Sequence, residues 1–169
     1  ELPTAAQQAE WTQQITMHTM LHENLKQFMQ GFRYDAHPMG IFLSTVGALS
    51  TFYQDSLDPF DPQQVEISTI RLMAKVPTLA AYAHKKTVGQ PYMYPDNNLG
   101  YVANFLEMTF GVPAEKYVVN KAVVDALDML FILHADHEQN CSTSTVRMVG
   151  SSKANLFASM AAGVSALWG

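Results

Sequence analysis

The sequence predicts an all-α protein, and three observations support this prediction. Apolar residues between positions 41 and 53 recur every three or four residues, which is the spacing of one helical face. Residues that favour helix starts, such as Thr4 and Asn120, stand directly before other apolar segments. No alternating apolar and polar run of strand length occurs, and the sequence contains no internal repeat.

The N-terminal part predicts two helical segments. Thr4 and Gln7 have the spacing of a capping box, so a helix should begin there and run past Ile15. A second segment covers residues 21–28 and ends near Gly31, a residue suited to a left-handed stop. Together they predict a helical hairpin or one bent helix.

Prolines mark the limits of the next helices. Pro38 suits the first turn of a helix that should continue to about Asp55. Residues 58–62 contain two X–Pro steps, which disfavour helix, so we expect a turn there. A further helix should cover residues 63–75, stop at Pro77 and then resume, because proline lacks the N–H that a helix needs.

The second half predicts a loop followed by three helical segments. Residues 89–98 mix turn formers with aromatic residues and should form an ordered loop able to contact a ligand. Asn98 should cap a helix that ends near Gly111, and Asn120 should cap the next one. That next helix is apolar nearly all round, which predicts that it lies inside the domain. Residues 154–168 are rich in Ala and Gly and suit close contact between helices.

Composition limits the classes of function. The 169 residues, 48% of them hydrophobic and 15% charged, suit one globular domain. A formal net charge of -5 without basic runs argues against a nucleic-acid or membrane-surface binder. Apolar stretches are far shorter than the roughly 20 residues that cross a bilayer, and the first residues are unlike a signal peptide. The single cysteine, Cys141, forms no internal disulfide, which favours a cytoplasmic location.

Four of the six histidines stand in two spaced pairs, so metal binding is one hypothesis. His18 and His22 are four residues apart on a predicted helix and could share one ion. A site of this kind needs further ligands, and Thr19 stands where a zinc protease has Glu, so we expect no metal. The alternative is a non-catalytic helical assembly or metal-binding protein built on this pair and on His134 and His137.

Polar residues become dense directly after the apolar helix. Residues 134–147 contain two imidazoles, two carboxylates, two amides and four hydroxyls. Buried polar groups must bond one another or face a ligand. A binding site is one interpretation. The other is that His134 and Asp136 are satisfied buried groups and that the hydroxyls cap the following helix. The residues alone leave both open.

This stretch closely resembles the citrate synthase family of the bacterial type. The resemblance covers essentially the whole chain, in the family's order and spacing, at residues 18–23, 37–39, 52–57, 89–91, 134–147, 150–155 and 161–169. It implies that residues 1–169 are a fragment of the large helical domain of an acyltransferase of the tricarboxylic acid cycle. Such an enzyme condenses oxaloacetate with acetyl-CoA to citrate and CoA. It needs no metal or other cofactor and works as a homodimer or hexamer.

The resemblance also implies which residues serve the substrate. His137 should contact oxaloacetate, Asn140 should line the same pocket, and Ser142 should orient a catalytic His of a later segment. In the family the catalytic His and Asp lie in segments that would follow Gly169, and the small domain is absent here too. We therefore expect the fragment to be inactive by itself, because catalysis needs a positioned base and a donor for the enolate oxygen.

Larger bacterial members of the family are inhibited by NADH, an allosteric effect. Their binding region matches seven residues of this chain: His18, Thr19, Tyr53, Arg71, Lys75, Gln90 and Asn97. Arg71 and Lys75 lie one predicted helical turn apart, which suits phosphates, and solvated ion pairs are the alternative interpretation. Met17 departs from the pattern, because those members carry an Arg there.

2-Methylcitrate synthase, which takes propionyl-CoA, is a further alternative with the same implied fold. One added methylene changes discrimination by only about 1 to 3 kcal/mol, so this region does not separate the two acyl-CoA substrates. Helices as apolar as those after Asn98 and Asn120 also predict burial against another subunit.

Overall fold

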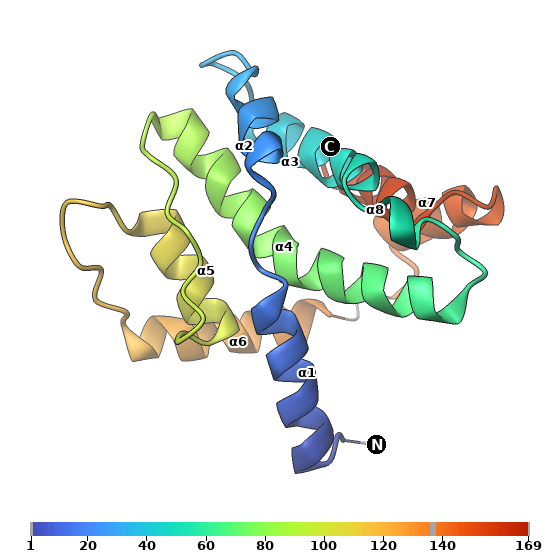
Figure 1. Ribbon diagram of the computed structural model, residues 1–169, viewed down its shortest axis with the longest axis horizontal. Coiled ribbons are helices and arrows are strands. Elements are labelled where there is room, and N and C mark those ends of the chain that lie inside the picture. The colour runs from blue at the N-terminus through green and yellow to red at the C-terminus, as the bar shows by residue number, and fades with distance from the viewer. Residues whose placement is uncertain (1, 136–137, 169) are drawn as a thin grey trace.

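The structure is a computed structural model that describes residues 2–135 and 138–168 (Figure 1). Every regular element in these two ranges is a helix, which confirms the all-α prediction. The α-helices are α1 (Ala5–Met17), α2 (Glu23–Gln30), α3 (Pro38–Ala48), α4 (Pro62–Val88), α5 (Tyr101–Phe110), α6 (Lys121–His134), α7 (Cys141–Ser151) and α8 (Leu156–Ala166). Two short 3₁₀ turns, η1 (Leu49–Thr51) and η2 (Gln54–Ser56), join α3 to α4. Of the helices described, none combines the length and the apolar character that a membrane span requires.

The 27-residue helix α4 is the central element of the fold. In Figure 1 it crosses the middle of the molecule, with α5 on one side and α3 and α8 on the other. The helix begins after Asp61, whose carboxylate accepts from the Gln63 N–H at 2.9 Å, and it ends at Gly89 in the left-handed region. The main core lies where α4 meets α2, α3 and α8, and its most deeply buried members are Leu25, Met29, Ile41, Val46, Leu79, Tyr82 and Phe157.

Pro77 lies inside α4 and does not interrupt it, so the predicted break is wrong. Proline has no N–H, which leaves the Met73 carbonyl, four residues earlier, without its usual helical partner. The hydroxyl of Tyr101 on α5 donates to that oxygen at 2.9 Å. A side chain from another helix therefore replaces the missing bond and allows α4 to continue.

The N-terminal segments are two separate helices joined by a turn. The capping box of α1 is confirmed, because Thr4 Oγ1 accepts from the Gln7 N–H at 3.3 Å and Gln7 Oε1 accepts from the Thr4 N–H at 2.9 Å. Gly31 follows α2 as predicted, but its φ of -70° is right-handed, so the predicted left-handed stop is wrong. The Gly31 N–H instead closes a tight turn on the Phe28 carbonyl at 3.1 Å.

Helix α3 ends earlier than predicted. It begins at Pro38 as expected, but its α-helical part stops at Ala48, and the chain then tightens into η1 and η2 instead of continuing to Asp55. The hydroxyls of Ser50 and Thr51 donate to the carbonyl oxygens three residues before them, each at 2.8 Å. Local side-chain bonds of this kind compete with the regular helical ladder.

Asn98 does not cap α5, contrary to the prediction. Its backbone N–H and its amide nitrogen donate to Asp96 Oδ1, at 2.9 and 2.8 Å, so the side chain closes a turn instead. Helix α5 starts later, at Tyr101. The predicted end at Gly111 is confirmed, as is the cap of α6, where Asn120 Oδ1 accepts from a first-turn N–H at 2.9 Å.

Helix α6 does not lie in the core of this chain, so that prediction is wrong. None of its residues is buried, and Ile132 and Leu133 are 70% and 63% exposed. Its main helical neighbour among the described elements is α5. An apolar pattern indicates that a helix can be buried, but it does not say whether the covering surface belongs to the same chain.

Helices α7 and α8 pack closely, as the small residues of the last segment predict. A Cβ atom added to Gly163 would lie 2.6 Å from Val146 Cγ2, so only glycine fits there without movement. Gly40 of α3 likewise lies under the ring of Trp168, where an added Cβ would be 3.0 Å from the indole. The missing side chain at Gly163 lets α7 and α8 approach closely, and the one at Gly40 leaves room for the Trp168 ring.

Candidate functional site

The junction between α6 and α7 carries the predicted substrate residues that the structure describes. Asn140 is the N-cap of α7, and its Oδ1 accepts from the Thr143 N–H at 2.9 Å and from the Ser142 hydroxyl at 2.7 Å. Asn140 and Ser142 are half-buried and directly bonded to each other. His137, predicted to contact oxaloacetate, lies outside the described residues. Glu138 has a φ of 58°, in the left-handed region, so the backbone turns sharply just before α7.

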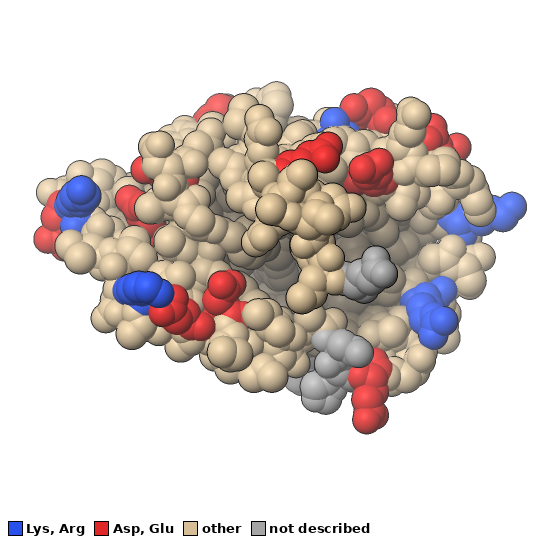
Figure 2. Space-filling model, turned by 90° about the horizontal axis from the view of Figure 1, so that it is seen from below, with Lys and Arg blue, Asp and Glu red and all other residues tan. Residues whose placement is uncertain are grey.

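His134 lies at the end of α6 and faces an apolar cleft. The cleft has a volume of about 960 Å³ and lies between α1, α4, α5 and α6, with Ile15, Pro77, Tyr101 and Phe131 among its lining residues. Figure 2 shows the molecule hollowed near the centre of its lower face, with uncharged side chains around the hollow. A dicarboxylate needs cationic partners, so this cleft does not fit oxaloacetate, and an apolar group suits it better.

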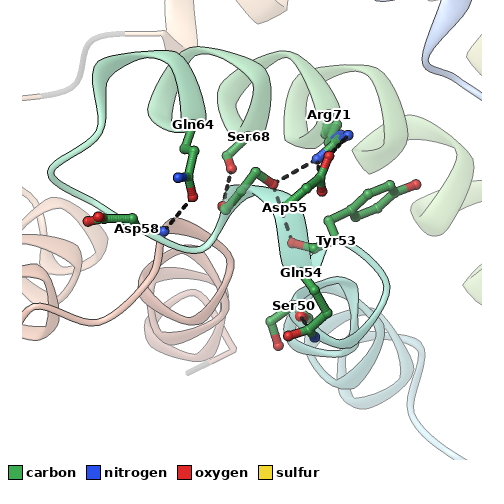
Figure 3. Close-up of polar contacts among 9 residues, drawn as sticks. Ser50, Tyr53, Gln54, Asp55, Asp58, Gln64, Ser68 and Arg71 are labelled. Carbon is green, nitrogen blue, oxygen red and sulfur yellow. Dashed lines mark hydrogen bonds and ion pairs between the residues drawn. The ribbon is translucent and has the colours of Figure 1, made fainter.

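A second polar cluster surrounds Tyr53 and is shown in Figure 3. Arg71 of α4 donates to both carboxylate oxygens of Asp55, at 2.8 and 2.9 Å, and to the Ser56 hydroxyl at 2.8 Å. Its guanidinium carbon lies 4.4 Å from the centre of the Tyr53 ring. The Arg71 guanidinium holds the pKa of Asp55 below its usual value. The ion pair is therefore bidentate and shielded on one face by an aromatic ring.

Lys75, one turn further along α4, is buried with 4% exposure. Its ammonium donates to the carbonyl oxygens of His18 and Met20, the latter at 2.7 Å, and Thr78 donates to the Thr19 carbonyl at 3.0 Å. Burial lowers the pKa of Lys75 to about 8, and the nearby Arg71 charge acts in the same direction. Helix α4 thus holds the turn between α1 and α2, because side chains of α4 donate to the backbone carbonyls of that turn.

The structure brings together most of the residues that match the NADH region. His18, Thr19, Tyr53, Arg71 and Lys75 gather around the first half of α4. Two others lie elsewhere. Gln90 accepts from Lys85 at 2.7 Å, and Lys85 lies ten residues beyond Lys75, or about 15 Å along the helix. Asn97 is exposed in the loop before α5. Arg71 forms an ion pair, but its side chain is only 14% exposed, so the pair is not the fully solvated one of the alternative interpretation. Lys75 is bound to backbone carbonyls.

The sequence model of the family described as "Citrate synthase, C-terminal domain" matches residues 1–169. The chain belongs to the citrate synthase family. It is 65% identical over 169 residues to citrate synthase 1 of Mycobacterium tuberculosis in two strains, and the match covers 100% of this chain and 39% of that protein. The chain therefore spans about two fifths of the length of the curated relatives it matches.

Solved citrate synthase structures have the same fold. The enzyme from Pyrobaculum aerophilum matches with a TM-score of 0.83 and 28% identity, covering 100% of this chain and 43% of that one. The enzyme from Thermotoga maritima matches with a TM-score of 0.81 and 20% identity, covering 100% of this chain and 42% of that one, and supports the fold alone. The helical arrangement described above is thus that of the citrate synthase family.

Sequence reasoning missed the residues that complete the polar cluster in this member of the citrate synthase family. Ser68 donates to the Ser56 carbonyl at 2.7 Å, and Gln64 accepts from the Asp58 N–H at 3.0 Å (Figure 3). With Arg71, Lys75 and Thr78, these side chains form a polar stripe on one face of α4, which we call the α4 stripe: Gln64, Ser68, Arg71, Lys75 and Thr78. Their spacing of three or four residues was the signal available in the sequence.

The two histidines of the first pair, His18 and His22, make separate local contacts in the fold. His18 Nδ1 lies 2.8 Å from the Gln14 carbonyl oxygen, and His22 Nδ1 accepts from the Asn24 N–H at 3.0 Å. Within residues 2–135 and 138–168, no group of three or more His, Cys, Asp or Glu side chains could hold a metal ion. The shared metal site of the alternative hypothesis therefore receives no support from His18 and His22, and His137 of the second pair lies outside the described residues.

The pKa of Lys75 leads to a testable pH dependence. Below about pH 8 the folded and unfolded states both hold the proton, and the folded state bears the cost of burying the charge. Between pH 8 and the ordinary pKa of 10.5, the folded state releases the proton first, so the free energy of unfolding should rise with pH.

We expect this rise to be about 3 kcal/mol larger in the unaltered protein than in a Lys75→Met variant. Denaturant unfolding of both proteins at a series of pH values measures it. Equal slopes would contradict the assigned pKa.

Proposed function

We propose that the protein carrying this chain condenses oxaloacetate with acetyl-CoA to give citrate and CoA, as an acyltransferase of the tricarboxylic acid cycle. The observation that carries the proposal is the 65% identity to citrate synthase 1 of Mycobacterium tuberculosis over all 169 residues. We further propose that this chain is part of the large helical domain and that the catalytic His and Asp lie outside it. On that proposal, the chain contributes to substrate binding and not to proton transfer.

Within this proposal, the α6–α7 junction forms part of the oxaloacetate pocket. His137 would contact the substrate, Asn140 would line the pocket, and Ser142 would orient the catalytic His. The geometry supports this, because Asn140 and Ser142 lie together at the N-terminus of α7, where the helix dipole favours a negative charge. The left-handed backbone at Glu138 turns the chain at the same place.

Regulation by NADH is a separate and less favoured proposal. Five of the seven matching residues lie together, which supports a binding region at the start of α4. However, binding of the dinucleotide phosphates would require Arg71 and Lys75 to exchange their present partners, and Met17 supplies no charge. A structural role for both cations agrees better with their contacts.

The proposal also includes an assembly and a location. We propose a homodimer or hexamer, because α6 exposes an apolar surface that includes Met129, Ile132 and Leu133. We propose a cytoplasmic location, since the single thiol, Cys141, needs no oxidising compartment. The acyl donor of the alternative function, propionyl-CoA, differs from acetyl-CoA by one methylene.

Replacement of His137 tests the function. In the intact protein, His137→Ala should raise the KM for oxaloacetate about 10- to 100-fold, because a hydrogen bond to a charged group is worth roughly 1.5 to 3 kcal/mol. The assay follows thiol release with acetyl-CoA and with propionyl-CoA. His84→Gln is the matched control, since it removes an imidazole that packs on Phe110 and should leave the KM unchanged. Unchanged kinetics of the His137 variant would refute the assignment, and faster turnover of propionyl-CoA would favour the 2-methylcitrate alternative.

A further inference from the structure

Two helices of this chain are capped by imidazoles. His22 is the N-cap of α2, where its Nδ1 accepts from the Asn24 N–H at 3.0 Å. His37 is the N-cap of α3, where its Nδ1 accepts from the Met39 N–H at 3.1 Å. The other side-chain caps among the described helices use Thr, Asp or Asn oxygens. An imidazole nitrogen accepts a hydrogen bond only while it carries no proton, so these two caps require neutral rings.

Two other histidines have the opposite requirement. His18 Nδ1 lies 2.8 Å from the Gln14 carbonyl oxygen at the end of α1, and His134 Nδ1 lies 2.7 Å from the Leu130 carbonyl oxygen at the end of α6. These contacts need a ring N–H, and a positive charge is favoured at a helix C-terminus. Acid therefore preserves the contacts of His18 and His134 and removes those of His22 and His37. A positive charge at the N-terminus of a helix is also unfavourable.

His22 lies beside an aromatic ring and an ion pair. It packs against Phe52 with the ring centres 5.3 Å apart. Glu23, whose charge acts on His22, already pairs with Lys26 at 3.0 Å, and both bind the Tyr94 hydroxyl. The negative charge beside His22 is thus largely satisfied by another cation.

The surroundings of His37 are similar. Its ring stacks on Trp168 with the centres 5.4 Å apart. The nearest charged side chains before it in the chain, Arg33 and Asp35, form their own ion pair at 2.9 Å. A proton on this ring would lose the cap bond and gain no described carboxylate partner.

We propose that His22 and His37 are a pair of acid-sensitive helix caps, and that the loss of both cap bonds in acid loosens helices α2 and α3. Helix α3 packs on α4 and α8, α2 packs on α4, and His22 directly follows the turn that Lys75 and Thr78 hold. His22 also packs against Phe52, the residue before Tyr53. This proposal does not depend on the proposed enzymatic function.

Hydrogen exchange in the intact protein at about pH 8 and about pH 5.5, corrected for intrinsic exchange rates, tests the proposal. At the lower pH, the first-turn amides of α2 and α3 should lose about fivefold protection for each lost cap. Helix α6, which Asn120 caps and which packs mainly on α5, is the internal reference, and its first turn should keep its protection.

Two variants separate the caps from other histidines. The double variant His22→Asn/His37→Asn keeps both caps without a titrating group and should abolish the loss. His84→Gln leaves the caps intact and should retain it. The proposal is overturned if the unaltered protein shows no loss, if the first turn of α6 shows the same loss, or if the double variant still shows it.

Discussion

Replacement of Lys85 by alanine is expected to destabilise the fold by about 3 to 5 kcal/mol. Lys85 lies near the end of α4 with 0% exposure, and its ammonium donates to Gln90 Oε1 at 2.7 Å and to the Gly111 carbonyl oxygen. Burial lowers the pKa of this lysine, but its two acceptors lose their donor if the side chain is removed. The alanine variant leaves the carbonyl of the buried Gly111 without this donor and opens an empty volume inside the structure, whereas the exposed Gln90 can bind water.

Lys85→Met separates these two contributions. Methionine fills most of the same volume and leaves the Gly111 carbonyl without its donor, so we expect a loss of only about 1 to 3 kcal/mol. Denaturant unfolding of the unaltered protein and the two variants gives the free energies. If the free energy of unfolding falls by less than about 1 kcal/mol in both variants, water replaces the ammonium. The bonds to Gln90 and Gly111 then contribute little to stability.

The second large effect is expected at the contact between α7 and α8. Gly163→Leu should cost about 3 kcal/mol, because even a Cβ at this position would lie 2.6 Å from Val146 Cγ2 and 3.8 Å from the Ser142 carbonyl oxygen. Relief of the clash would push α7 away and displace Ser142. In the intact protein, we therefore expect a lower activity as well as a lower stability.

A double-mutant cycle provides the control for this contact. Gly163→Ala should be destabilising in the native background and much less so in a Val146→Ala background, where the clashing methyl group is absent. Unfolding free energies of the two single variants and the double variant give the coupling. Additive effects would show that the helices adjust freely and that the close contact is not important.

Several features of the fold that depend on local chemistry were predictable from the sequence, although the Asn98 cap and the left-handed Gly31 were not. Thr4, Pro38 and Asn120 start helices as predicted, because caps and first-turn prolines act through bonds a few residues apart. The break at Pro77 was wrong for a non-local reason. The Met73 carbonyl, which Pro77 leaves without a helical donor, accepts a hydrogen bond from Tyr101, which lies on a different helix. The exposure of α6 also depends on which surfaces are available, and a periodic pattern does not reveal them.

The candidate site was predictable in composition and much less so in its bonds. The resemblance singled out Asn140 and Ser142, which the structure places in direct contact, but the roles assigned to them and to His137 stay predictions. Lys75 shows the limit most clearly, because its described hydrogen-bond partners are backbone carbonyl oxygens. Every residue offers a carbonyl, so the sequence contains no signal for such a partner.

The α4 stripe affects how the protein opens locally. The five side chains of the stripe attach two connecting segments, the α1–α2 turn and the α3–α4 connection, to a single rod about 40 Å long, and most of these bonds end on backbone atoms. A connection can therefore detach alone while α4 and the other connections stay folded, so the segments should open as separate units. Such an arrangement tolerates insertions and sequence drift in one connection, because the alignment of the rest depends on the helix and not on its neighbours.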